Sequence, residues 1–157
     1  MTTESDLLRI SLPTKSDYIS VLRLTVSGIC NRMNYTIDDT ETIKLAVSEA
    51  YTNVIKHAYK IKSIAPTIIT IMIDASGLKI SVIDHGDGFD IGSEKQTYDF
   101  ESLDSLAVGM GVGLTFIKSL MDTMTIQSTP GIGTVITMYK KRSAIADNQL
   151  ARPLTGQ

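Results

Sequence analysis

The spacing of apolar residues along the chain changes between a period typical of helices and one typical of strands. Apolar residues recur every three or four positions in residues 15–34 and in a second segment that ends near residue 59, which predicts two amphipathic helices. A third helix is predicted after a glycine-rich segment and ends near Met121. Runs rich in β-branched residues predict five strands, at residues 7–12, 67–73, 78–83, 123–128 and 133–139.

These elements follow one another as strand, helix, helix, two strands, a long loop, helix and two strands. Short glycine-containing turns join the strands of the last two pairs, so we expect hairpins and a mixed, mostly antiparallel sheet. Because such a sheet must bury one apolar face, helices should cover that face in a two-layer α/β sandwich of the α+β kind. Residues 1–141 are expected to form one domain, with residues 142–157 as a polar tail.

Two details of this scheme depend on weaker signals. Thr14 followed by Asp17 resembles a capping box at the first helix, and either Thr36 or Asp38 can cap the second. Residues 91–108 are polar and lack periodic apolar positions, which predicts a lid or binding loop without regular structure.

Composition excludes several functional classes. The 157 residues carry a net charge of −2, so no general basic field favours nucleic acid. No apolar run reaches the roughly 20 residues that a membrane helix needs, and the polar N-terminus is not typical of a signal peptide. The single cysteine, Cys30, falls among apolar helix positions and is interpreted as a small core residue. The absence of disulfide pairs favours a cytoplasmic protein.

Three polar side chains, Glu49, Asn53 and His57, lie four residues apart in the second helix. Each step of four residues drifts by only about 40° around the helix, so the three form one slanting row. This row is either a solvated face or the wall of a site. It borders the apolar face of Ala46, Ala50 and their neighbours, which favours the wall, although His57 could be a satisfied core histidine.

Glycines accompany further polar residues at the predicted strand and helix ends. Asp84 ends a strand and is followed by Gly86 and Gly88, which is typical of a turn but also suits a carboxylate that accepts a hydrogen bond from a base. Gly109, Gly111 and Gly113 precede the third helix, whose free N–H groups could bind phosphate; a flexible hinge is the alternative. Gly133 and Thr134 open the last strand, in a hairpin turn or in support of a ligand-binding carboxylate.

The order of these motifs resembles the GHKL ATPase superfamily, and within it the small bacterial anti-sigma factor serine kinases. The resemblance rests on Glu49 and Asn53 in the second helix, Asp84-x-Gly86-x-Gly88, the glycine-rich segment and Gly131-x-Gly133-Thr134, and it covers roughly residues 10–139. It implies the Bergerat-type ATP-binding fold of that superfamily.

The resemblance also implies roles for residues. Glu49 would be the catalytic base, Asn53 would ligate Mg²⁺ and Asp84 would hold the adenine amine with help from Thr134. The remaining ATP-binding positions would be His57, Gly86, Gly88, Gly109, Gly111 and Gly113.

At the level of function, the resemblance implies an anti-sigma factor and protein serine kinase. It would sequester an alternative sigma factor and use ATP with Mg²⁺ to phosphorylate a serine of a STAS-type antagonist, which would inactivate that antagonist. The resemblance also implies a homodimer. Arg23, in the first helix, is either a solvated arginine or a contact to a partner. Two alternatives stay open: an ATP-binding anti-sigma module without kinase activity, and a domain that does not use ATP.

Overall fold

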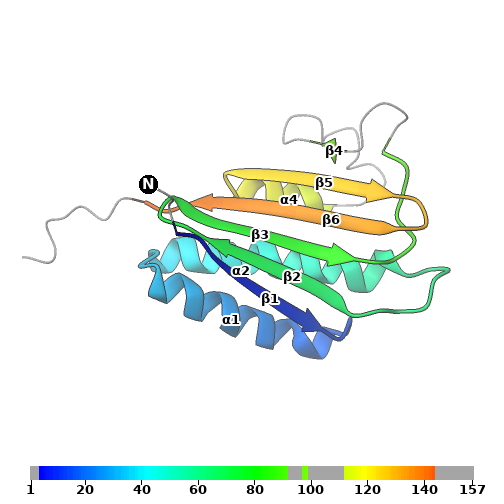
Figure 1. Ribbon diagram of the computed structural model, residues 1–157, viewed down its shortest axis with the longest axis horizontal. Helices are drawn as coiled ribbons and strands as arrows, with labels where there is room; N and C mark the ends of the chain where they lie inside the picture. Colours follow the sequence, from blue (N-terminus) through cyan, green and yellow to red (C-terminus); the bar gives the residue numbers. More distant parts are fainter. Residues whose placement is uncertain (1–3, 92–96, 99–111, 144–157) are drawn as a thin grey trace, which may run out of the picture.

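The fold is a six-stranded antiparallel sheet with helices on one face (Figure 1). The computed structural model describes residues 4–91, 97–98 and 112–143. The strands run in the order β1-β2-β3-β6-β5-β4, and every pairing is antiparallel. Their bounds are β1 (Asp6–Leu12), β2 (Thr67–Ile73), β3 (Gly77–Asp84), β4 (Thr97–Tyr98), β5 (Thr123–Thr129) and β6 (Gly133–Lys141). The helices are η1 (Ser16–Tyr18), α1 (Ile19–Arg32), α2 (Ile37–Asn53), the π-helical segment η2 (Val54–Ala58) and α4 (Val112–Leu120).

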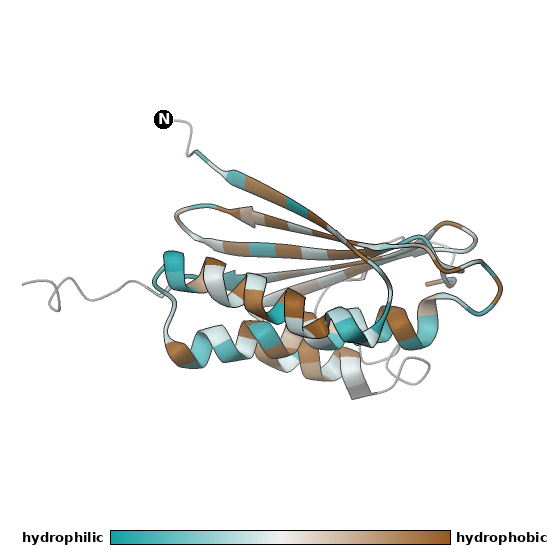
Figure 2. Ribbon diagram, turned by 90° about the horizontal axis from the view of Figure 1, so that it is seen from below, coloured by the Kyte–Doolittle hydropathy of each residue, from teal (hydrophilic) through white to brown (hydrophobic). Residues whose placement is uncertain are grey.

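The expected two-layer sandwich is confirmed (Figure 2), and the described sheet contains no parallel pair. Alternate residues of the long strands are buried, because successive strand side chains point to opposite faces and only one face is covered. α2 packs against both α1 and α4 and so occupies the centre of the helical layer. The core includes Cys30, as the sequence predicts, together with Met33, Met121 and Met124. Burial raises the pKa of the Cys30 thiol to about 11.

The start of the first helix differs from the prediction. Thr14 does not cap it, because its hydroxyl donates to the Ala65 carbonyl (2.6 Å) and pairs with the Thr67 hydroxyl (2.8 Å). A short 3₁₀ turn begins after Lys15 instead, and the α-helix starts only at Ile19. The second helix is capped by Thr36, whose side chain accepts a hydrogen bond from the Asp39 N–H (3.0 Å).

Two further differences from the prediction concern the end of the second helix and the long polar loop. The second helix changes from α to π geometry after Asn53, so the predicted single row of Glu49, Asn53 and His57 does not continue at a constant turn angle. The stretch predicted to lack regular structure contains the short edge strand β4, which pairs with β5. The rest of the predicted lid, residues 92–96 and 99–108, lies outside the described residues, as do residues 144–157 of the tail.

Candidate functional site

A cavity of about 360 Å³ opens where α2 gives way to η2, beside the end of β3 and the start of β6. Its walls combine apolar surface with a few polar groups, which is the usual make-up of a small-molecule site. The lining residues are Asn53, Val54, His57, Ala58, Lys60, Ile61, Asp84, Asp87, Gly88, Phe89, Thr134 and Ile136. The structure therefore gathers Asn53, His57, Asp84, Gly88 and Thr134 around one cavity, although they are far apart in sequence.

Asp84 is the buried carboxylate of this cavity, with 6% of its surface exposed. Its Oδ1 accepts hydrogen bonds from the backbone N–H groups of Gly86 (2.9 Å) and Thr134 (3.2 Å). Burial raises the pKa of Asp84, and the two N–H donors oppose that rise. Because both of these bonds fall on Oδ1, Oδ2 has no donor among the described residues and can accept one from a ligand in the cavity.

Thr134 supports Asp84 through its backbone and not through its hydroxyl. Its backbone N–H reaches Asp84, while its hydroxyl pairs with the hydroxyl of Ser128 (2.8 Å). Ser128 also accepts a hydrogen bond from the Phe89 N–H (3.0 Å), so it ties β5 to the loop after β3. The sequence reasoning missed Ser128; its signal is a polar residue at an inward position of β5, after Met124 and Ile126.

Gly86 and Gly88 let separate backbone segments meet behind the cavity. A Cβ at Gly86 would lie 2.1 Å from the Ala58 carbonyl oxygen, and one at Gly88 would lie 2.1 Å from the Thr129 carbonyl oxygen. Gly88 also has φ +63°, in the left-handed region that favours glycine. These two glycines therefore shape the cavity by close approach, and larger residues would displace its walls.

Glu49, Asn53 and Gly113 lie together at the first turn of α4. A Cβ at Gly113 would lie 2.3 Å from Glu49 Oε1 and 3.1 Å from Asn53 Oδ1. Asn53 is 6% exposed, and its Nδ2 is the one buried side-chain polar atom without a hydrogen-bond partner within the described residues. A buried amide with unused hydrogen-bonding capacity is unusual in a folded protein and indicates a ligand position. The carboxylate and the amide thus face a helix N-terminus, where anions are favoured.

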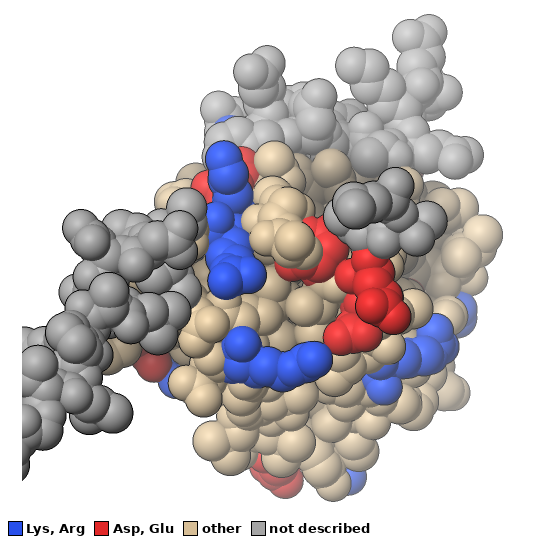
Figure 3. Space-filling view, turned by 60° about the vertical axis from the view of Figure 1, so that its left-hand side comes forward, with Lys and Arg blue, Asp and Glu red and all other residues tan. Residues whose placement is uncertain are grey.

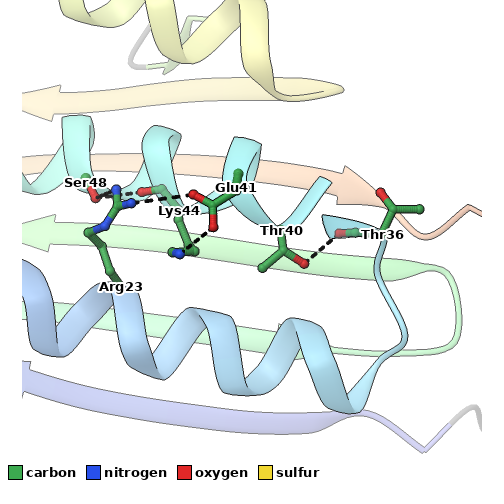
Figure 4. A network of polar contacts seen from close by, with 6 residues as sticks. All are labelled: Arg23, Thr36, Thr40, Glu41, Lys44 and Ser48. Carbon is green, nitrogen blue, oxygen red and sulfur yellow. Dashed lines mark hydrogen bonds and ion pairs between the residues drawn. The ribbon is translucent and has the colours of Figure 1, made fainter. Parts of the chain in front are cut away.

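The other predicted site residues have different surroundings. His57 is exposed and lines the cavity, so the interpretation as a core histidine is wrong. Arg23 reaches from α1 to α2, where it donates to the Ser48 hydroxyl (3.3 Å) and lies 3.7 Å from the Glu41 carboxylate (Figure 4). Gly109 and Gly111 lie outside the described residues.

Two features of the described residues bear on membrane and nucleic-acid partners. None of the helices in the described part of the chain has the length and apolar character needed to cross a membrane. On the face shown in Figure 3, Lys and Arg form separate groups, with a group of acidic side chains among them. That face offers no continuous basic surface of the kind that phosphate backbones favour.

Two solved structures share the fold of this chain. A crystal structure of the RsbU and RsbW domains of a Mycobacterium tuberculosis protein superposes with a TM-score of 0.64 at 18% identity, over 88% of this chain and 34% of that one. This chain thus spans about a third of that protein. The histidine kinase domain of a blue-light activated kinase from Erythrobacter litoralis gives 0.53 at 16% identity, over 82% of this chain and 60% of that one.

Sequence comparison identifies the family of this chain more specifically than these structures do. The protein named serine-protein kinase RsbW in Staphylococcus aureus is 39% identical over 153 residues, covering 94% of this chain and 96% of that protein. The protein of the same name in Bacillus velezensis is 35% identical over 143 residues, covering 88% and 89%. The family model described as a histidine kinase-like ATPase domain matches residues 12–140. The chain therefore belongs to the histidine kinase-like ATPase domain family, and within it to the group of the RsbW serine-protein kinases.

Proposed function

We propose that this protein is an ATP-dependent serine-protein kinase that also acts as an anti-sigma factor. The observation that carries the proposal is the placement of Glu49 and Asn53 around Gly113, at the first turn of a helix and next to a cavity that contains the buried Asp84. This arrangement provides separate places for the adenine base of ATP, for its phosphates and for the hydroxyl group of a protein substrate. The family membership supports the use of ATP.

Phosphoryl transfer depends chiefly on positioning and on charge stabilisation, and the residues divide this work. Asp84 Oδ2 accepts a hydrogen bond from the exocyclic amine of adenine, which selects the base. The Glu49 carboxylate accepts the proton of the attacking serine hydroxyl and orients its oxygen toward the γ-phosphate. The N–H groups of the first turn of α4 have no partner within the helix and stabilise negative charge on the phosphates, and Gly113 leaves room for the phosphates.

Asn53 is the residue that would hold Mg²⁺. Its Oδ1 lies beside Gly113 at the proposed phosphate position, and its unpaired Nδ2, a hydrogen-bond donor, would pair with a phosphate oxygen there. Mg²⁺ that binds with a nucleotide takes few protein ligands and keeps water and phosphate oxygens, so a single amide oxygen fits the ion. When bound, the ion would neutralise phosphate charge. The role of the protein is to hold the Asn53 amide in position for it.

The proposed partners are an alternative sigma factor and a STAS-type antagonist protein, whose serine receives the phosphoryl group in the cytoplasm. Phosphorylation adds a charge of about −2, which weakens a contact made by the uncharged serine. Unphosphorylated antagonist would compete with the sigma factor for the kinase. Homodimerisation and a docking role for Arg23 belong to the same proposal; Arg23 lies at the junction of α1 and α2, away from the cavity.

The test is transfer of labelled γ-phosphate from ATP to a cognate antagonist, followed by identification of the modified serine. We expect transfer that depends on Mg²⁺ and release of the sigma factor by unphosphorylated antagonist. Binding of ATP without any transfer would favour the alternative function, an anti-sigma module without kinase activity.

Stabilisation by the nucleotide separates both functions from a domain that does not use ATP. At 100 times the dissociation constant, ATP with Mg²⁺ should add about 2.7 kcal/mol to the free energy of unfolding. A thermal melt with and without the nucleotide measures this difference as a higher Tm. Identical melting curves at saturating nucleotide would contradict every ATP-dependent role proposed for the cavity.

Replacement of Asp84 by asparagine should weaken ATP binding without destabilising the protein. Asn can still accept the two N–H bonds on its carbonyl oxygen, but its NH₂ group then faces the adenine amine, donor against donor. Loss of a hydrogen bond to a charged group costs about 1.5–3 kcal/mol, so the Kd for ATP should rise about 10- to 100-fold. Titration calorimetry measures it, and an unchanged Kd would contradict the adenine-binding role of Asp84.

The difference in stability between Asp84→Asn and the wild-type protein should depend on pH in a definite direction. Because burial raises the pKa of Asp84 in the folded protein, stability falls as pH rises from the unfolded pKa through the folded pKa. The ionised carboxylate therefore costs stability at neutral pH, and this cost disappears below the unfolded pKa. Without ATP, Asp84→Asn should melt at or above the wild-type temperature at neutral pH, and its advantage should shrink on acidification.

A further inference from the structure

Asp87 connects three segments of the chain at the mouth of the cavity. Its Oδ2 accepts hydrogen bonds from the backbone N–H groups of Lys60 (2.8 Å) and Ile61 (2.9 Å), and its Oδ1 accepts from that of Lys62 (2.8 Å). The donors are three successive residues, separated from Asp87 by 25 to 27 positions in sequence. One carboxylate thus fixes the direction of three peptide groups.

The backbone of Asp87 joins the same assembly. Its N–H donates to the Ala58 carbonyl (2.7 Å), and its carbonyl accepts from the Gly131 N–H (2.7 Å). The Lys62 ammonium donates to the Gly131 carbonyl (3.1 Å), which closes the connection between the loop after η2 and the β5–β6 turn. The loop after β3 is therefore the centre to which both neighbouring segments are attached.

The segment Lys60–Lys62 needs this attachment because burial does little to hold it. All three residues are exposed, Ile61 to 92%, and no helix or strand includes them. Lys60 and Ile61 nevertheless line the cavity, next to Ala58. An exposed segment without packing would sample many backbone conformations, so its shape as a cavity wall depends on the hydrogen bonds that it donates.

We propose that Asp87 is a positioning residue for nucleotide binding, which acts by holding Lys60–Lys62 in place as the outer wall of the cavity. This inference rests on the proposed function, because it assigns the cavity to ATP. Asp87 itself also lines the cavity, but its two carboxylate oxygens accept all three N–H bonds of the segment, so its effect on the cavity is assigned to the segment that it holds. The three bonds also lower the pKa of Asp87, so the carboxylate stays ionised under ordinary conditions.

The experiment compares Asp87→Ala with a matched control, Asp74→Ala. Asp74 also caps a turn with its carboxylate, accepting hydrogen bonds from the N–H groups of Ser76 (2.7 Å) and Gly77 (3.1 Å). That turn lies at the opposite end of β3, roughly 23 Å from Asp84 at about 3.3 Å per strand residue. Both variants lose a capped turn, but only Asp87→Ala alters a cavity wall.

Asp87→Ala should change the KM for ATP and the hydrogen exchange of the segment, but not kcat. If the segment keeps its binding-competent shape about a tenth of the time, the KM for ATP in Asp87→Ala should rise about tenfold at unchanged kcat. Asp87→Asn should be intermediate, because its amide keeps an acceptor for one side of the segment only. Hydrogen exchange of the N–H groups of Lys60–Lys62 should accelerate in Asp87→Ala. In Asp74→Ala, both the KM and this exchange should remain as in wild type.

Several outcomes would overturn the inference. A wild-type KM in Asp87→Ala, with or without faster exchange, shows that the wall does not depend on Asp87 or does not serve the nucleotide. An equal rise of KM in Asp74→Ala shows general loosening of the fold, and a fall in kcat at unchanged KM shows a role in chemistry. If wild-type protein does not bind ATP, the proposed function fails, and this inference fails with it.

Discussion

Glu49→Gln should abolish most phosphoryl transfer while leaving ATP binding intact. Gln has nearly the same size and can keep its place beside Gly113, but it cannot accept the proton of the serine hydroxyl. A positioned general base contributes roughly 10²- to 10⁴-fold, so kcat for transfer to the antagonist should fall by about that factor. Single-turnover transfer of labelled γ-phosphate measures the rate, and the rise of Tm with ATP measures retained binding.

The matched control is Asp38→Asn, which makes the same charge change near the start of the same helix. Asp38 is exposed and lies 11 residues before Glu49, about 16 Å along the helix axis at 1.5 Å per residue. Its transfer rate should remain within a factor of about two of wild type, because its only expected role is with the helix dipole. If Glu49→Gln transfers phosphate as fast as this control, Glu49 is not the base.

The long strands and helices could be predicted because each has a strong local signal. The β-branched runs of β2 and β3 are bounded by turn residues, and α1 and α2 carry regular apolar spacing. β4 could not be found in this way, since two residues are too short to show a period and its pairing with β5 is non-local. Likewise, the hydroxyl of Thr14 binds Ala65 and Thr67, residues that local capping rules do not consider.

The candidate site could be predicted only from the order of several motifs along the chain. Asp84 before two glycines is also typical of a turn, and Asn53 one turn after Glu49 is also compatible with a solvated face, so neither motif predicts a ligand position alone. Ser128 and the cavity-lining residue Ile61 were missed, because their roles arise from segments that meet only in the folded chain. The change to π geometry after Asn53 also has no local signal in the sequence that a regular helical wheel would detect.

Gly113→Ala should reduce transfer about 100-fold without destabilising the protein. A Cβ at this position would lie 2.3 Å from Glu49 Oε1, and the flexible carboxylate can move away more easily than the backbone can. A displacement of about 1 Å in a catalytic group can cost about 10²-fold in rate. Alanine is also the better helix former by up to about 1 kcal/mol, so the Tm should be equal or higher. Kinetic assays and thermal melts test the two halves of this prediction.

Gly28→Ala serves as the control, since Gly28 is helical and a Cβ there meets no atom within 4 Å. It should gain helix stability and keep the wild-type transfer rate. A double variant then identifies the cause of the Gly113→Ala defect. If the methyl group acts by displacing the carboxylate, adding it to Glu49→Gln should cost little more, because the base is already absent. A full additional loss of about 100-fold would instead mean that alanine disturbs the phosphates or Asn53, whose Oδ1 lies 3.1 Å from the same Cβ position.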